Sequence, residues 1–149
     1  MSNNQTQGFY VGSLITSVVG AVLLLLTDFA GWDGSNYYLG LSIEGSVGVS
    51  FEEPLSFILF LPPLVLLLFC AYVSVLGLQG NIQTKQITMG FYSAIGAMVY
   101  VIAGGLIFLV AILEDEPEYW WFDAGFFGGV IGSALTVLLF YYVLKQTKT

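Results

Sequence analysis

The sequence has few of the residues that usually carry out chemistry. Its 149 residues include no histidine and no arginine, and three lysines stand against ten acidic residues. Histidine is the commonest metal ligand, a frequent haem ligand and a usual general base. Its absence excludes histidine-ligated haem, histidine-ligated copper sites, zinc hydrolysis and Ser-His-Asp catalysis within this chain. Nucleic-acid binding is excluded too, because the chain has no basic patch.

Cysteine is also nearly absent. Cys70 is the single cysteine and lies inside an apolar run, so an internal disulfide is impossible. We interpret it as a small buried side chain, with palmitoylation or a disulfide to another protein as alternatives. We therefore expect no enzyme activity, no catalytic residue, no metal site and no cofactor other than bound lipid.

What the sequence has in abundance is apolar residues. They make up 57% of the chain, whereas charged residues make up 9%, against roughly 25% in an ordinary soluble domain. Four apolar runs are long enough to cross a hydrocarbon core of roughly 30 Å. The first run lacks a basic flank and exceeds the apolar part of a signal peptide, which favours a transmembrane helix. We predict a single all-α membrane domain, a bundle of four transmembrane helices with a small extracytoplasmic β-hairpin in its first loop.

The predicted organisation covers residues 1–149. The helices are expected at about 9–29, 55–78, 87–113 and 124–144, with outer loops at 30–54 and 114–123 and an inner loop at 79–86. Four spans place both termini on one side, and Lys85, Lys145 and Lys148 then share that side. The positive-inside rule places it in the cytoplasm. We expect a multi-pass protein of the plasma (cell) membrane.

Small residues at helical spacing predict close helix contacts in the first and last spans. In the last span they form one broad glycine face, which either packs within the bundle or contacts another subunit. The residues predicted to pack are Gly8, Gly12, Gly125, Gly128, Gly129, Gly132 and Ser133.

Two successive prolines, Pro62 and Pro63, fall inside the second span. Each removes a helix hydrogen bond, so we expect a kink or a short break there. The kink is either absorbed by packing or forms a pocket or hinge.

The long polar stretch from Thr27 to Glu53 contains two segments with a period of two, on either side of Glu44-Gly45. This pattern predicts a β-hairpin with one apolar face. A two-stranded hairpin is marginally stable alone. We expect it to lie on the bundle, gain a third strand or pair with another chain. The predicted partner interface is Tyr37, Leu39, Leu41, Ile43, Val47, Val49 and Phe51.

Aromatic residues and a lysine flank the last span. Trp120, Trp121, Tyr141, Tyr142 and Lys145 are predicted to anchor the chain at the two membrane interfaces. Alternatively, the two tryptophans stack on a glycan or on a lipid head group.

An acidic tip, Glu114-Asp115-Glu116-Pro117-Glu118, lies just before the tryptophans. We interpret it as a solvated cap, with Ca²⁺ binding together with Glu52 and Glu53 as the alternative. No acid or base lies in the middle of a span, so a transporter is not expected from this chain alone. A pore formed between several copies of the chain is an alternative.

The layout resembles that of the claudin and peripheral-myelin-protein type of membrane protein. The local likenesses are Gly31-Trp32 soon after the first span, Tyr38-Leu39-Gly40-Leu41, Ile102-Ala103-Gly104-Gly105-Leu106, and Asp123-Ala124-Gly125-Phe126-Phe127. The resemblance implies a β-sheet in the first outer loop, a shorter second outer loop and both ends inside. The cysteine pair that claudins carry in their first loop is absent here.

Two functions fit these observations. The first is a non-catalytic structural or assembly protein whose partners are membrane lipid and copies of itself or other subunits. The second is an accessory scaffold subunit of a larger membrane-bound enzyme or respiratory complex. Copurification separates them, because oligomers of this chain alone would support the first function.

Overall fold

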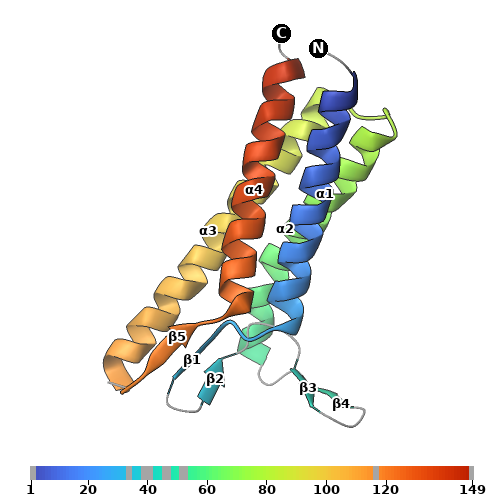
Figure 1. The fold of residues 1–149 in the computed structure, drawn as a ribbon. Coiled ribbons are helices and arrows are strands. Elements are labelled where there is room, and N and C mark those ends of the chain that lie inside the picture. Colours follow the sequence, from blue (N-terminus) through green and yellow to red (C-terminus); the bar gives the residue numbers. More distant parts are fainter. Residues whose placement is uncertain are drawn as a thin grey trace.

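The computed structural model describes residues 3–32, 35–37, 42–44, 48–50, 54–115 and 118–147. In these ranges the chain forms four long α-helices and five three-residue strands (Figure 1). The helices are α1 (Asn3–Leu26), α2 (Pro54–Leu78), α3 (Thr84–Asp115) and α4 (Ala124–Thr147). The strands are β1 (Ala30–Trp32), β2 (Ser35–Tyr37), β3 (Ser42–Glu44), β4 (Gly48–Ser50) and β5 (Trp120–Phe122).

The helices form an antiparallel bundle in which α1 and α3 each pack against both α2 and α4. The start of α1 and the end of α4 lie together at one end, which we call the terminal end (Figure 1). The strands lie at the opposite end, the sheet end. Each helix contains a stretch long and apolar enough to cross a membrane, so the four predicted spans are confirmed as helices.

The helix ends differ from the predicted ones by a few residues. Helix α1 stops at Leu26 instead of continuing to Phe29, which is buried just before β1. Helix α3 begins at Thr84 rather than at Ile87, and α4 continues to Thr147. The predicted limits followed the apolar runs, whereas polar residues continue helices beyond the apolar part.

A glycine closes α2. Gly80 has a φ of 72°, a left-handed conformation that glycine adopts at little cost. Its backbone N–H donates to Gly77 O over 3.2 Å, and the N–H of Asn81 donates to Leu76 O over 3.2 Å. This pair of bonds is the Schellman arrangement that satisfies carbonyls at a helix end.

Side chains cap the starts of α3 and α4. At α3, the Gln86 side-chain oxygen accepts a hydrogen bond of 2.8 Å from the backbone N–H of Gln83, as in a capping box. At α4, the Asp123 carboxylate accepts one of 2.7 Å from the N–H of Ala124. These polar caps explain why α3 begins before its apolar run.

Helix α2 runs through Pro62 and Pro63 without interruption, which excludes the short break; a kink, the other predicted outcome, stays a prediction. Proline has a fixed φ that is itself helical, and packing against neighbouring helices can hold the backbone in place despite the lost hydrogen bonds. Pro63 is fully buried and Pro62 is half-buried, which fits this explanation.

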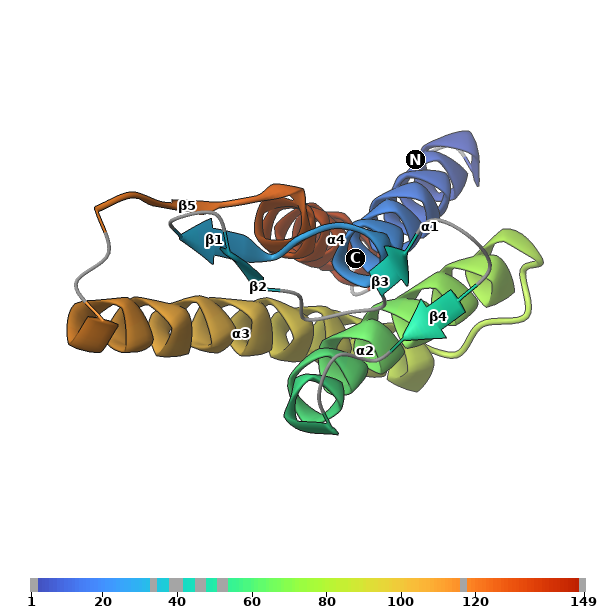
Figure 2. The same cartoon turned by 90° about the horizontal axis from the view of Figure 1, so that it is seen from below.

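The strands form two separate sheets. In the first, β1 is central and pairs antiparallel with both β2 and β5, in the order β2-β1-β5. Gly31 lies opposite Asn36 on one side and opposite Trp121 on the other. The second sheet is the β3–β4 ribbon, in which Ile43 pairs with Val49. The two sheets lie apart at the sheet end, with the ribbon on the α2 side (Figures 1 and 2).

The predicted hairpin is therefore correct only in part. Glu44 was expected in the turn but pairs with Gly48 within the ribbon. Tyr37 belongs to the other sheet, because it pairs with Ala30. Leu39, Leu41, Val47 and Phe51 lie outside the described residues.

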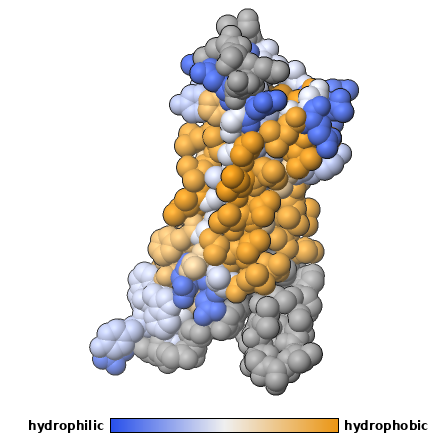
Figure 3. Space-filling model, turned by 45° about the vertical axis from the view of Figure 1, so that its right-hand side comes forward, coloured by the Kyte–Doolittle hydropathy of each residue, from blue (hydrophilic) through white to orange (hydrophobic). Residues whose placement is uncertain are grey.

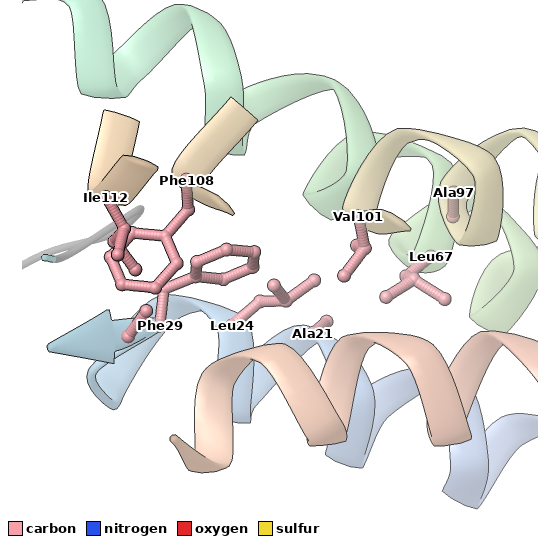
Figure 4. Packing of buried hydrophobic residues seen from close by; sticks show 9 residues of the cluster. Ala21, Leu24, Phe29, Leu67, Ala97, Val101, Phe108 and Ile112 are labelled. Atoms are coloured by element: carbon pink, nitrogen blue, oxygen red, sulfur yellow. The ribbon is translucent and has the colours of Figure 1, made fainter. Parts of the chain in front are cut away.

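The interior of the bundle contains two apolar clusters. One, toward the sheet end, is built on Leu24, Phe29, Val101, Phe108 and their neighbours (Figure 4). The other, toward the terminal end, is built on Tyr10, Cys70, Phe140 and their neighbours.

The outer surface between the two ends is apolar as well. On the face shown in Figure 3, apolar residues cover the middle of the bundle, with hydrophilic residues above and below them. We call this apolar middle zone of the outer surface the apolar belt. Each helix contributes large apolar side chains that are more than half exposed, for example Ile15 (56%), Val65 (54%), Leu106 (58%) and Leu138 (53%).

Candidate functional site

Helices α1 and α4 approach until their glycine backbones touch. A Cβ placed on Gly132 would lie 2.9 Å from Gly20 Cα and 2.9 Å from Thr16 O, whereas ordinary contacts are 3.4–4 Å. A Cβ on Gly128 would lie 2.5 Å from Leu23 Cβ. Only glycine fits at these positions without moving a helix, as in other small-residue contacts between apolar helices.

The rest of the glycine face also packs within the chain. A Cβ on Gly125 would lie 2.7 Å from Asp28 O, and the Gly125 N–H donates to this same oxygen over 2.9 Å. A Cβ on Gly129 would lie 3.0 Å from Leu24 and from Val101. The face predicted in the last span therefore lies against α1, the segment after α1, and α3.

The remaining predicted packing residues behave differently from one another. A Cβ on Gly12 would lie 3.1 Å from the Leu139 side chain, and Ser133 is buried with its hydroxyl donating to Gly129 O over 2.6 Å. Gly8 is exposed, and a Cβ there would meet nothing within 4 Å. Within this chain the predicted packing of Gly8 is not seen, because Gly8 lies on the outward side of α1. On the other side of the same turns, Thr6 hydrogen-bonds to Gln146 and Phe9 stacks on Tyr142 of α4.

Hydroxyl groups join the helices at the same depth as the glycines. The Ser13 and Ser74 hydroxyls lie 2.7 Å apart and link α1 to α2. The Thr16 and Thr136 hydroxyls lie 2.8 Å apart and link α1 to α4. Among the described residues, every buried side-chain nitrogen and oxygen has a hydrogen-bond partner. This is required in an apolar interior, where a polar group without a partner is costly.

Helices α2 and α3 are joined by a weaker contact. The Cys70 thiol is fully buried and donates to Gly90 O over 3.3 Å. The structure thus places Cys70 in the core, as predicted for a small buried side chain. On α2, two turns away from Cys70, a Cβ on Gly77 would overlap the Tyr10 ring of α1.

The sequence prediction did not include the contacts of Thr16 and Gly20 on α1 or of Ser74 and Gly77 on α2. Ser13, Thr16 and Gly20 occupy positions i, i+3 and i+7 on α1, and Cys70, Ser74 and Gly77 occupy i, i+4 and i+7 on α2. Both spacings place three small residues on one helix face, a signal that was present in the sequence. The predicted packing set is based on glycine and serine pairs four residues apart, a pattern that these combinations of i+3, i+4 and i+7 do not match.

Aromatic residues hold the sheet end together. Phe29 is 1% exposed and meets the ring of Phe126 edge-on, with centroids 5.4 Å apart. Phe122 of β5 stacks on Phe126 at 4.1 Å, and Phe108 of α3 lies 5.5 Å from Phe122. Through β5, this cluster fixes the segment before α4 to the segment after α1.

The predicted interface anchors lie at both ends of the apolar belt. Trp120 (48% exposed) and Trp121 (38%) belong to β5 at the sheet end. Tyr141 (51%), Tyr142 (48%) and Lys145 lie on α4 near the terminal end. An anchoring role remains a prediction.

Most side chains of the acidic tip lie outside the part of the chain that the structure describes. Glu118 is its one member with a described side chain, and it is exposed. Within the described ranges, no three acidic, cysteine or histidine side chains come together in a way that could hold a metal ion. The proposed Ca²⁺ site is thus largely outside the described residues.

Two surface clefts of similar size lie beside α4. One, of about 360 Å³, lies between α1 and α4, and its floor includes Gly128 and Gly132. The other, of about 400 Å³, lies between α3 and α4 near the terminal end. The first is lined almost wholly by apolar side chains, whereas the second also contains Thr88, tyrosines and Lys145.

Comparison of the chain with protein-family models, curated proteins and solved structures gives no match.

Proposed function

We propose that this chain is a multi-pass membrane protein with a non-catalytic, structural or assembly role. The observation that carries the proposal is the apolar belt. In the most apolar 18-residue window of each helix, only 33–39% of the residues are buried within the bundle. The remaining surface is too apolar for water, and a lipid bilayer is the environment that would cover it.

The charges support a definite orientation. Lys85 and Lys145 lie at the terminal end, whereas Asp28, Glu118 and Asp123 lie at the sheet end. Under the positive-inside rule, the terminal end faces the cytoplasm and the sheet end faces outward, with the protein in the plasma membrane.

The assembly role is supported by the β3–β4 ribbon. Among the described residues, β3 and β4 pair only with each other, so each strand has one edge without a strand partner. A two-stranded ribbon is marginal alone, and an open edge can pair with another chain. We assign the ribbon to contact with a neighbouring copy.

The layout agrees with the claudin-like resemblance. The first loop carries strands, the second loop is shorter, and both ends of the described chain lie at one end of the bundle. These features are also those of a general four-helix bundle with a decorated loop, so the resemblance adds to the proposal without carrying it.

Two experiments test the proposal in turn. Extraction of native membranes with alkaline carbonate should leave the chain in the pellet, and release into the supernatant would refute membrane insertion. Native mass spectrometry of the gently extracted protein should then show oligomers of this chain alone. A defined complex with other chains would replace the proposal with a scaffold subunit of a larger membrane enzyme.

A cysteine-crosslinking comparison locates the contact. Ile43→Cys in the ribbon should give a disulfide-linked dimer, whereas Leu113→Cys, at a side chain 77% exposed on α3, should give little. Cys70 is 0% exposed and so does not compete. Monomer alone from the Ile43 variant, or equal dimer from both variants, would count against a contact through the ribbon.

A further inference from the structure

The cleft between α3 and α4 near the terminal end is built from two matching helix faces. Its lining residues are Thr88, Phe91 and Tyr92 of α3 and Tyr141, Leu144 and Lys145 of α4. On each helix the three residues occupy positions i, i+3 and i+4, so each set forms one continuous patch. The two patches face each other across a cleft of about 400 Å³.

The chemistry of the cleft changes with depth. Because α3 and α4 are antiparallel, Thr88 and Lys145 both lie nearer the terminal end than Tyr92 and Tyr141 do. Along α3, Tyr92 lies four residues from Thr88, and along α4, Tyr141 lies four residues from Lys145, so the two levels are about 6 Å apart. The cleft is therefore polar and positively charged at its outer level and aromatic one turn deeper.

The positive charge at the outer level comes from Lys145. It is one of three lysines in a chain whose net charge is −7, so a cation at this cleft is unusual for the molecule. The Thr88 hydroxyl donates to Thr84 O over 2.9 Å and is committed to the helix. Lys145 is the cationic residue of the lining, and its ammonium group attracts an anionic group.

We propose that this cleft binds one anionic phospholipid. The phosphate contacts the Lys145 ammonium group at the level where head groups lie, since lysines near helix ends reach the interface. The upper part of an acyl chain lies against Phe91, Tyr92 and Leu144. The inference rests on the proposed membrane insertion and adds a ligand class and a place to it.

A phospholipid suits this cleft better than a free phosphate ion. Four of the six lining residues are aromatic or aliphatic, and these would bury a hydrocarbon chain but give nothing to a hydrated inorganic anion. The single lysine supplies a charge preference, while the aromatic walls supply contact area.

The test measures which lipids stay bound to the purified full chain in detergent micelles. Equal amounts of phosphatidylglycerol and phosphatidylcholine are added, and native mass spectrometry gives the ratio of the two single-lipid adducts. Wild-type protein should favour phosphatidylglycerol. Lys145→Gln should lower that ratio about fivefold, the effect expected for one lysine at an anionic head group.

Lys85→Gln is the matched control, because it removes the same charge at the same end of the bundle from an exposed residue that does not line the cleft. Its ratio should equal that of the wild type. Equal loss in both variants would show general charge attraction and overturn the site, as would an unchanged ratio in Lys145→Gln.

Two further arms complete the design. Tyr92→Ala, at a side chain 65% exposed, should reduce both lipid adducts without changing their ratio, and no reduction would remove the acyl-chain part of the proposal. Inorganic phosphate at the same concentration as the lipid should not displace phosphatidylglycerol, and displacement would reassign the cleft to a free anion. Because the ratio is measured in micelles, it is independent of the carbonate-extraction result.

Discussion

Gly132→Ala tests the central helix contact of the bundle. The added methyl carbon would lie 2.9 Å from the backbone of Gly20 and of Thr16, so α1 and α4 must separate by about half an ångström to reach 3.4 Å. Overpacking of this kind costs about 1–3 kcal/mol. Separation also weakens the 2.8 Å bond between Thr16 and Thr136, worth about 0.6 kcal/mol between membrane helices.

One effect opposes this loss. Alanine is a better helix former than glycine by about 1 kcal/mol, so the net loss in free energy of unfolding is about 0.5–2.5 kcal/mol. The measurement is an SDS titration in mixed micelles, followed by far-ultraviolet circular dichroism.

Gly8→Ala is the matched control for this prediction. It makes the same chemical change in the same kind of helix, but the new methyl group would meet nothing within 4 Å. Its free energy of unfolding should stay the same or rise slightly, because only helix propensity changes. A Gly132→Ala protein as stable as the wild type, or an equal loss in Gly8→Ala, would refute the close-contact reasoning.

Three further predictions concern other parts of the bundle. Phe29→Ala removes a side chain 1% exposed and should lower the free energy of unfolding by about 3–5 kcal/mol in the same titration, with a loss below about 1 kcal/mol contradicting its core position. A double-mutant cycle of Ser13→Ala and Ser74→Ala should give a coupling of about 0.6 kcal/mol, and strict additivity would deny the interhelical bond. Gly31→Cys with Trp121→Cys should form an intramolecular disulfide on a non-reducing gel, because the two residues are opposite one another in the β1–β5 pair, and failure under oxidation would contradict this register.

The helices of this protein could be predicted from the sequence because one physical quantity determines them. A run of about 20 apolar residues is helical wherever it must satisfy its own backbone, and all four runs are helices in the structure. The errors lie at helix ends such as the start of α3, where the Gln86 side chain supplies a cap before the apolar run begins. Capping depends on single polar side chains, which hydropathy does not register.

The sheets could not be predicted to the same extent. The period of two on either side of Glu44-Gly45 indicated strands, but it did not show that each described strand is only three residues long or which strands pair. Trp120-Trp121-Phe122 was interpreted only as an interfacial aromatic cluster, yet it forms β5 and pairs with β1 from the other loop. Pairing between segments some 90 residues apart leaves no local pattern in the sequence. Tyr37 was assigned to the hairpin, but its partner is Ala30 of β1, which was not predicted as a strand.

The candidate sites divide in the same way, into features of a single helix, which the sequence predicted, and contacts between helices, which it did not. The glycine face of α4 is a property of one helix and was visible as a spacing. Its partner surface on α1 and the cleft that contains Lys145 each require two helices to be placed at a particular rotation. A single helix sequence specifies which residues share a face, but not which face of the next helix they meet.

The middle of the bundle and its sheet end are held by different forces, and the apolar belt explains why. Within the belt, an apolar surrounding would remove the hydrophobic gain from helix contact, so close packing at Gly20 and Gly132 and hydroxyl bonds such as Ser13–Ser74 must provide specificity. At the sheet end water is available, hydroxyl bonds lose most of their net value, and burial of rings such as Phe29 and Phe122 becomes favourable. The change from small and hydroxyl-bearing contacts to aromatic contacts therefore marks the depth at which the helices leave the proposed bilayer.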